Sequence, residues 1–180
     1  MSNKLIYPTV DFCKEIENYR NEMIQNNDSF DGCSDLRKFE NMEKWVQYTY
    51  DLQDKNKIPP HYVTAEQYLL VNEKKRILGM IQLRHELNDY LLEIGGHIGY
   101  SVRPSERRKG YATRILSYAL KECKKLGLDK VILGCYKKNI GSAKTIIKNG
   151  GKLIREEDYI KQVNDNYTIN LVNQFYEIYI

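Results

Sequence analysis

The chain has 180 residues, of which 42% are apolar, and this is enough to build one well-filled core. Lys and Arg outnumber Asp and Glu by 28 to 24, and a net charge of +4 is too small to indicate a nucleic-acid partner. No apolar run approaches the roughly 18 residues that cross a bilayer, and the first residues lack the apolar centre of a signal peptide. We therefore expect a single domain over residues 1–180, with neither a membrane nor a nucleic acid as partner.

The cysteines show no C-x-x-C pairing, and Cys123 falls on a helix face that is predicted to be buried. Neither a disulfide framework nor a metal site is therefore predicted. A reducing compartment fits this pattern best, and we expect a cytoplasmic protein.

Two amphipathic helices are expected in the first third of the chain. Thr9 can cap a helix that runs to about Asn26 and has one apolar face, formed by Cys13, Ile16, Met23 and Ile24. The second helix has apolar residues at steps of three and four, Met42, Trp45, Val46 and Tyr50, and must end before the turn-forming stretch DKNKIPP.

Strand patterns begin at Gln67. YLLVN, a polar turn at 73–75 and RILGMIQL read as a β-hairpin, and LLEIGGHIGYSV reads as a third strand. Glycines are poor strand formers, so Gly95, Gly96 and Gly99 indicate a bulge or a place where a ligand approaches the backbone closely.

The second half of the chain alternates helix and strand. A regular apolar stripe predicts a helix over 112–126, followed by the buried strand KVILGC. A short helix over Asn139–Asn149 and the closing strand pair LIREEDYIKQV and NQFYEIYI complete the chain. The order of elements predicts a mixed α/β domain.

Between the third strand and the long helix lies a loop with the pattern [Q/R]-x-x-G-x-[G/A], formed by residues 107–112. Gly110 permits a tight turn, Ala112 leaves room for a phosphate, and the N–H groups at the helix start face an anion. The alternative interpretation of the same six residues is a basic surface loop that is only solvated and binds no phosphate. The patterns for nucleoside triphosphates and for dinucleotides are absent.

HIGYSVRPSERRKGYATRILSYAL, the buried strand after it and NIGSAKTIIKNGG together resemble the GNAT N-acetyltransferase superfamily over about the last two-thirds of the chain. RHELN, GGHIGYSVRP and KNGG resemble a bacterial subgroup whose substrates are not generally known. The resemblance implies a central, largely antiparallel sheet flanked by helices, with a splayed strand pair that holds acetyl-CoA.

The implied reaction transfers an acetyl group to a primary amine of a small molecule or peptide. A non-catalytic protein that binds acyl-CoA as a sensor or scaffold stays open, and so does a homodimer. RNA binding through RRKG ranks third, because no stripe of aromatic and basic residues accompanies it. We expect acceptor selection to fall to the first two helices, their loop from Asn26 to Glu40 and the final strands.

The same resemblance assigns the cofactor contacts. Backbone groups of Tyr100 and Val102 would bind the pantetheine arm like an added strand. The pyrophosphate would lie on Arg107, Arg108, Lys109, Gly110, Tyr111, Ala112 and Thr113. Asn139 and Ser142 would lie near the pantetheine, although Asn139 is equally suited to cap a helix. The candidates for the outer phosphates are the cations of Arg103, Arg108 and Lys109.

For catalysis, the resemblance places the N–H of Tyr100 at the oxyanion of the tetrahedral intermediate. Glu93 and His97 are the candidate bases, because on one strand they would share a face. His97 is preferred, since an imidazole with a pKa of about 6.5 suits a general base. The sequence favours purely structural roles for His97 and Glu93 as strongly as catalytic ones. His85 and Glu86 are weaker candidates.

A general acid for the leaving thiol is missing from its usual place. The family often has a tyrosine at the position that is Ile146 here, and Tyr136 is the nearby replacement. A thiol with a pKa of about 8.5 leaves as the thiolate near pH 7 at a cost of only about 2 kcal/mol, so turnover can survive without a dedicated acid.

Overall fold

The computed structural model describes residues 3–164 and 167–180, which form two antiparallel sheets with helices packed against them. In chain order the strands and helices are β1 (Asn3–Ile6), η1 (Val10–Phe12), α1 (Cys13–Gln25), η2 (Leu36–Lys38), α2 (Met42–Asp51), β2 (Ala65–Asn72), β3 (Ile77–Arg84), α3 (Asp89–Glu93), β4 (Ile98–Val102), η3 (Pro104–Glu106), α4 (Tyr111–Lys125), β5 (Lys130–Tyr136), α5 (Ile140–Lys148), β6 (Lys152–Asn164) and β7 (Tyr167–Tyr179).

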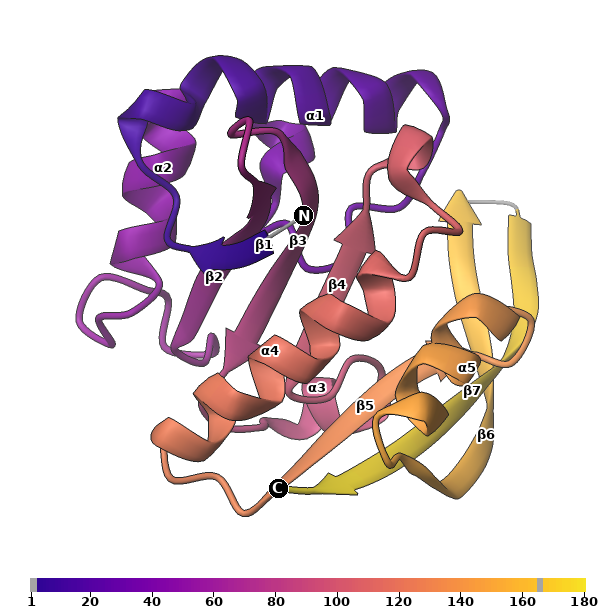
Figure 1. Ribbon diagram of the computed structural model, residues 1–180. Coiled ribbons are helices and arrows are strands. Elements are labelled where there is room, and N and C mark those ends of the chain that lie inside the picture. Colours follow the sequence, from indigo (N-terminus) through magenta and orange to yellow (C-terminus); the bar gives the residue numbers. More distant parts are fainter. Residues whose placement is uncertain (1–2, 165–166) are drawn as a thin grey trace.

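The first sheet has the order β1-β2-β3-β4, and the second has the order β5-β7-β6. Figure 1 shows the second sheet, in orange and yellow, beside the first, with α4 and α5 in front of them. Within the described residues, the ladder between the sheets consists of an isolated bridge from Gly96 to Leu133. The predicted α/β class is confirmed, and the expected splay divides the sheet into two between β4 and β5.

The first sheet separates two apolar cores. On one face, Leu69 and Met80 pack with α1 and α2 residues such as Ile16 and Trp45. On the other face, Leu70 and the buried face of α4 belong to a second cluster, which continues into β5 and β7. Burial of apolar surface on both faces holds β2 and β3 in the middle of the fold.

The two N-terminal helices form as predicted, but their buried faces differ in detail. The first begins as η1, and the Thr9 side chain makes no capping hydrogen bond. Ile24 is 37% exposed and Tyr50 is 42% exposed, so neither belongs to the core. Tyr19 and Thr49 are buried in α1 and α2 instead, because they complete the step of three or four residues on each buried face.

The third predicted strand was too long at its start. Asn88 caps the short helix α3 by accepting the N–H of Leu91 through its side chain, and β4 begins only at Ile98. Glu93 therefore lies on a helix. β1 was not predicted, because a four-residue strand carries almost no periodic signal.

The helices of the second half agree closely with the sequence. α4 buries Ile115, Leu116, Ala119 and Cys123, and the Asn139 side chain accepts the N–H of Ser142 to cap α5. The predicted closing strand pair is confirmed as β6 and β7, each longer than expected.

Candidate active site

The open edge of β4 faces the gap between the two sheets. In an antiparallel pair, successive residues alternate between those that bond the partner strand and those that point away from it. Arg103 N–H donates to the Leu78 carbonyl at 2.9 Å, so Ser101, two residues earlier, also bonds β3. The N–H and C=O groups of Tyr100 and Val102 must then point into the gap toward β5. This is the edge that an extended ligand would need.

The phosphate loop, residues 107–113, leads from η3 into α4. Arg108 and Gly110 both have left-handed backbones, with φ of 65° and 80°. The first helical bond runs from Arg114 N–H to the Gly110 carbonyl at 3.2 Å. The amides of residues 111–113 therefore precede the helical ladder and are available to an anion at the positive end of the helix. The loop has the form that the sequence predicted.

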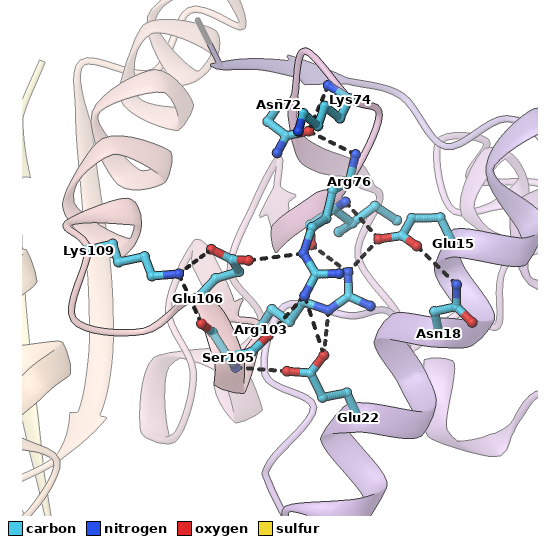
Figure 2. Close-up of polar contacts among 11 residues, drawn as sticks. Glu15, Asn18, Glu22, Asn72, Lys74, Arg76, Arg103, Ser105, Glu106 and Lys109 are labelled. Atoms are coloured by element: carbon cyan, nitrogen blue, oxygen red, sulfur yellow. Dashed lines mark hydrogen bonds and ion pairs between the residues drawn. The ribbon is translucent and has the colours of Figure 1, made fainter. Parts of the chain in front are cut away.

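One predicted phosphate contact is wrong. Arg103 is only 2% exposed, and its guanidinium donates to the carboxylates of Glu15 and Glu22 and to the Ile77 carbonyl. Figure 2 shows these contacts between α1 and the end of β4. A side chain held in this way cannot reach the outer phosphates of a cofactor.

The other basic side chains of the loop are engaged to different degrees. Arg107 pairs with Asp28 at 2.9 Å and donates from Nε to the Val102 carbonyl at 3.2 Å. Lys109 pairs with Glu106 at 2.9 Å. Arg108 is exposed, with no ion pair to any described residue, and is the cation most available to a phosphate.

Two of the predicted cofactor residues meet across the gap. The Tyr100 hydroxyl lies 2.8 Å from Oγ of Ser142, at the start of α5. Burial raises the pKa of Tyr100 to about 12. Asn139 lies beside this contact as the cap of α5, accepting from Ser142 N–H at 3.1 Å. The structure therefore brings Tyr100, Asn139 and Ser142 together where β4 and α5 face each other.

His97 is held by β5 in a way that weakens its assignment as the base. The backbone N–H of His97 donates to the Ile132 carbonyl at 2.7 Å. The backbone N–H of Ile132 donates in turn to Nδ1 of the His97 ring at 3.0 Å. A neutral ring that accepts at Nδ1 carries its proton on Nε2 and has no lone pair left. Burial, together with nearby Arg84, lowers the pKa of His97, so the neutral form is favoured.

The premise that Glu93 and His97 share a strand face is wrong, since Glu93 ends α3. Its exposed side chain lines a cavity of about 290 Å³. The remaining lining residues come from α3, β6 and β7 and are Leu92, Arg155, Glu157, Asp158, Tyr159 and Asn173. A carboxylate in this cavity can accept a proton, either directly or through water.

The remaining candidate positions for an acid or a base lie in different parts of the fold. Ile146 lies on the buried face of α5 and belongs to the core, so α5 supplies no acid at that position. Tyr136 is half-buried at the end of β5, and burial raises its pKa. His85 bonds Thr64 through Nδ1 at 2.9 Å, and Glu86 lies near Lys55 at the surface.

The loop from Asn26 to Glu40 was expected to select the acceptor, but its close packing on β4 was not predicted. A Cβ at Gly32, where φ is +71°, would lie 2.1 Å from the Gly99 carbonyl oxygen and 2.6 Å from Cα of Tyr100. The backbone at Gly32 therefore packs directly against β4 at Gly99 and Tyr100. The only available signal was the short stretch DGC, which is typical of a turn.

Comparison with known families agrees with this geometry. A family described as "Acetyltransferase (GNAT) family" matches residues 30–150. The chain therefore belongs to the GNAT acetyltransferase family, and the expected enzyme class is confirmed. A search of curated proteins finds no significant sequence match.

Solved structures share the fold at low sequence identity. A ribosomal L7/L12 α-N-protein acetyltransferase, RimL, in complex with coenzyme A aligns with a TM-score of 0.73 at 15% identity, over 100% of this chain and 95% of that one. The microcin C7 self-immunity acetyltransferase MccE, in complex with acetyl-CoA and AMP, gives 0.68 at 17%, over 99% and 92%. An N-acetyltransferase from Staphylococcus aureus Mu50 gives 0.68 at 17%, over 99% of both chains.

Over residues 3–164 and 167–180, no helix is long and apolar enough to cross a bilayer. The same residues contain no group of three or more His, Cys, Asp or Glu side chains arranged to hold a metal ion.

Proposed function

We propose that residues 1–180 form one acetyltransferase domain in which the gap between β4 and β5 holds acetyl-CoA. The observation that carries this proposal is the alignment of two features. The outward backbone groups of Tyr100 and the outward N–H of Val102 lie at the end of β4, and this end of the strand lies beside the start of α4 (Figure 1). An extended arm on β4 would thus end with its pyrophosphate at a helix N-terminus.

In this arrangement the amides of residues 111–113 bind the pyrophosphate and Arg108 meets an outer phosphate. Arg107 and Lys109 contribute through their backbones, because Asp28 and Glu106 hold their side chains. Asn139 and Ser142 border the pantetheine. The bond between Tyr100 and Ser142 sets the spacing between β4 and α5 on that side.

The chemistry needs a deprotonated amine and a stabilised oxyanion. An alkylamine with a pKa of about 10.4 loses its proton near pH 7 at a cost of about 4.6 kcal/mol. The amine nitrogen then attacks the thioester carbon, and the carbon–sulfur bond breaks as the intermediate collapses. The N–H of Tyr100 would donate to the oxyanion.

We propose that Glu93, and not His97, accepts the proton of the acceptor amine through a water molecule. The support is that Glu93 faces a cavity whereas Nδ1 of His97 is already occupied by Ile132 N–H. His97 then serves to join the start of β4 to β5. Because a thiol is a good leaving group, no dedicated acid is required.

We propose that the acceptor is a primary amine of a small molecule or a peptide. Solved structures of the same fold include the protein acetyltransferase RimL and an enzyme described as a phosphinothricin N-acetyltransferase, so both kinds of acceptor should be tested. We place the reaction in the cytoplasm, because Cys13, Cys33, Cys123 and Cys135 are all free thiols.

The test is a thiol-release screen of the purified protein with acetyl-CoA against amino acids, polyamines, aminoglycosides and peptide N-termini. Release of CoA that depends on one acceptor class, with the acetylated product identified by mass spectrometry, would support the proposal. Tight CoA binding without release for any acceptor would instead favour the sensor or scaffold.

A further inference from the structure

We propose that Glu22, on α1, is a positioning residue for the cofactor: its carboxylate holds the start of the phosphate loop in place. This rests on the proposed function, since the loop is taken to bind the pyrophosphate. The sequence gives no hint of it, because Glu22 lies 85 residues before Arg107.

The two oxygens of the Glu22 carboxylate have separate partners. Oε1 accepts the backbone N–H of Ser105 at 2.7 Å, and Oε2 accepts Nε of Arg103 at 2.7 Å. Ser105 belongs to η3, which leads directly into the phosphate loop. One side chain thus fixes both the last residue before η3 and the backbone of η3 itself (Figure 2).

Neighbouring contacts hold the same segment from a second direction. Arg76, after the turn between β2 and β3, donates to Glu106 at 3.0 Å and to the Ser105 hydroxyl at 3.0 Å. Beyond the end of α1, Asp28 pairs with Arg107. Residues 103–107 are therefore held by α1 on one side and by the hairpin on the other, while the amides of 111–113 stay open to a ligand.

The cost of burying charge indicates that the Glu22 contacts have a role beyond net stability. A buried ion pair gives little net stability, because the desolvation of both ions offsets their attraction. Burial alone would raise the pKa of Glu22, but the hydrogen bonds from Ser105 and Arg103 lower it overall, so the carboxylate is ionised at neutral pH. What this costly arrangement supplies is a defined direction for the backbone that enters the loop.

The experiment compares wild type with Glu22→Gln and with Glu17→Gln as matched control. Glu17 lies on the same helix in an exposed pair with Lys14. In Glu22→Gln one oxygen becomes an NH₂ group, which cannot accept from Ser105 or from Arg103. The readouts are calorimetric CoA affinity, the thermal midpoint, and hydrogen exchange of residues 104–113 in the protein without CoA.

For Glu22→Gln we expect the Kd for CoA to rise by about tenfold or more, because small displacements of a binding loop have large effects. Exchange across 104–113 should accelerate by about fivefold. The thermal midpoint should fall by less than about 10 °C, because the buried Arg103 keeps its ion pair with Glu15. Glu17→Gln should match wild type in all three. If Glu22→Gln does not fold cooperatively, Glu22→Asp takes its place, since it keeps the charge and loses the reach.

Unchanged exchange across 104–113 would overturn the positioning role whatever happens to CoA. Faster exchange with unchanged CoA affinity would overturn it too, because loop placement would then not limit binding. If wild-type protein does not bind CoA, the proposed function fails, and the exchange measurement alone decides whether Glu22 holds the loop.

Discussion

The hydroxyl of Tyr100 on β4 lies 2.8 Å from Oγ of Ser142 at the start of α5, and this hydrogen bond joins the two elements beside the gap between the sheets. The same residue directs its backbone N–H into that gap. Side chain and backbone of Tyr100 therefore have separable roles: one joins two elements, and the other faces the proposed reaction centre.

Tyr100→Phe removes the bond to Ser142 and keeps the backbone N–H. We expect the free energy of unfolding to fall by about 1 kcal/mol, the usual net contribution of such a hydrogen bond. The kcat should fall by less than about tenfold, since the oxyanion donor remains. Urea unfolding and steady-state kinetics measure the two effects. A loss in kcat of about a hundredfold would show that the hydroxyl itself takes part in the chemistry.

Gly110→Val should abolish measurable CoA binding. At Gly110, φ is +80° and an added Cβ meets nothing within 4 Å, so the damage comes from backbone strain and not from a clash. Gly127 is a matched control, because it ends α4 with the same φ of +80° and the same open space. Gly127→Val should lose comparable stability and keep CoA affinity. Calorimetry giving equal affinity for Gly110→Val and wild type would rule out the phosphate loop as the binding site.

Glu93→Gln should lower kcat by about a hundredfold, the typical contribution of a general base. His97→Asn should lower it by less than about fivefold, because the amide oxygen can still accept the Ile132 N–H. CoA affinity should change little in either variant. The opposite pattern of kcat values would return the base to His97 and require its ring to leave Ile132 during turnover.

The stability of the protein should fall as the pH drops below about 6.5. Burial lowers the pKa of His97 in the folded state, whereas the unfolded side chain titrates near about 6.5. The unfolded state therefore binds the proton first, so this contribution is complete above pH 6.5 and is lost toward the folded pKa.

Urea unfolding at pH 7.5 and 5.5 measures this dependence, and His97→Asn should show a smaller difference than wild type. The contribution can be at most about 1.4 kcal/mol for each pH unit. Glu22 and Glu106 have lowered pKa values and stay ionised across this window. Equal pH dependence in wild type and His97→Asn would contradict the buried, neutral ring.

Tyr136→Phe should lower kcat by less than about tenfold, because a thiolate leaves without strong assistance from an acid. Tyr136 is half-buried at the end of β5, and its raised pKa keeps the hydroxyl protonated at neutral pH. The measurement is kcat at saturating acetyl-CoA, with circular dichroism to confirm the fold. A loss above about a hundredfold would make Tyr136 an essential acid.

Local patterns in the sequence determined the elements whose contacts are close along the chain. The stripe through Ile115, Leu116, Ala119 and Cys123 specified α4, and the residues around Gly110 specified a loop whose amides face outward. Asn139 could be identified as a cap because its partner, Ser142, is three residues away. Helical periodicity and capping depend on neighbours within about one turn, so a single sequence contains them.

Tertiary structure alone decided which distant residues meet. Arg103 has the charge expected of a phosphate ligand, but in the fold it is buried and paired with Glu15 and Glu22. Asn88 starts a helix that moves Glu93 off the strand, and Ile132 occupies the nitrogen that made His97 attractive as a base. The physical reason is that the protonation and availability of a polar side chain depend on partners brought together by folding, often many residues away, and no local pattern encodes them.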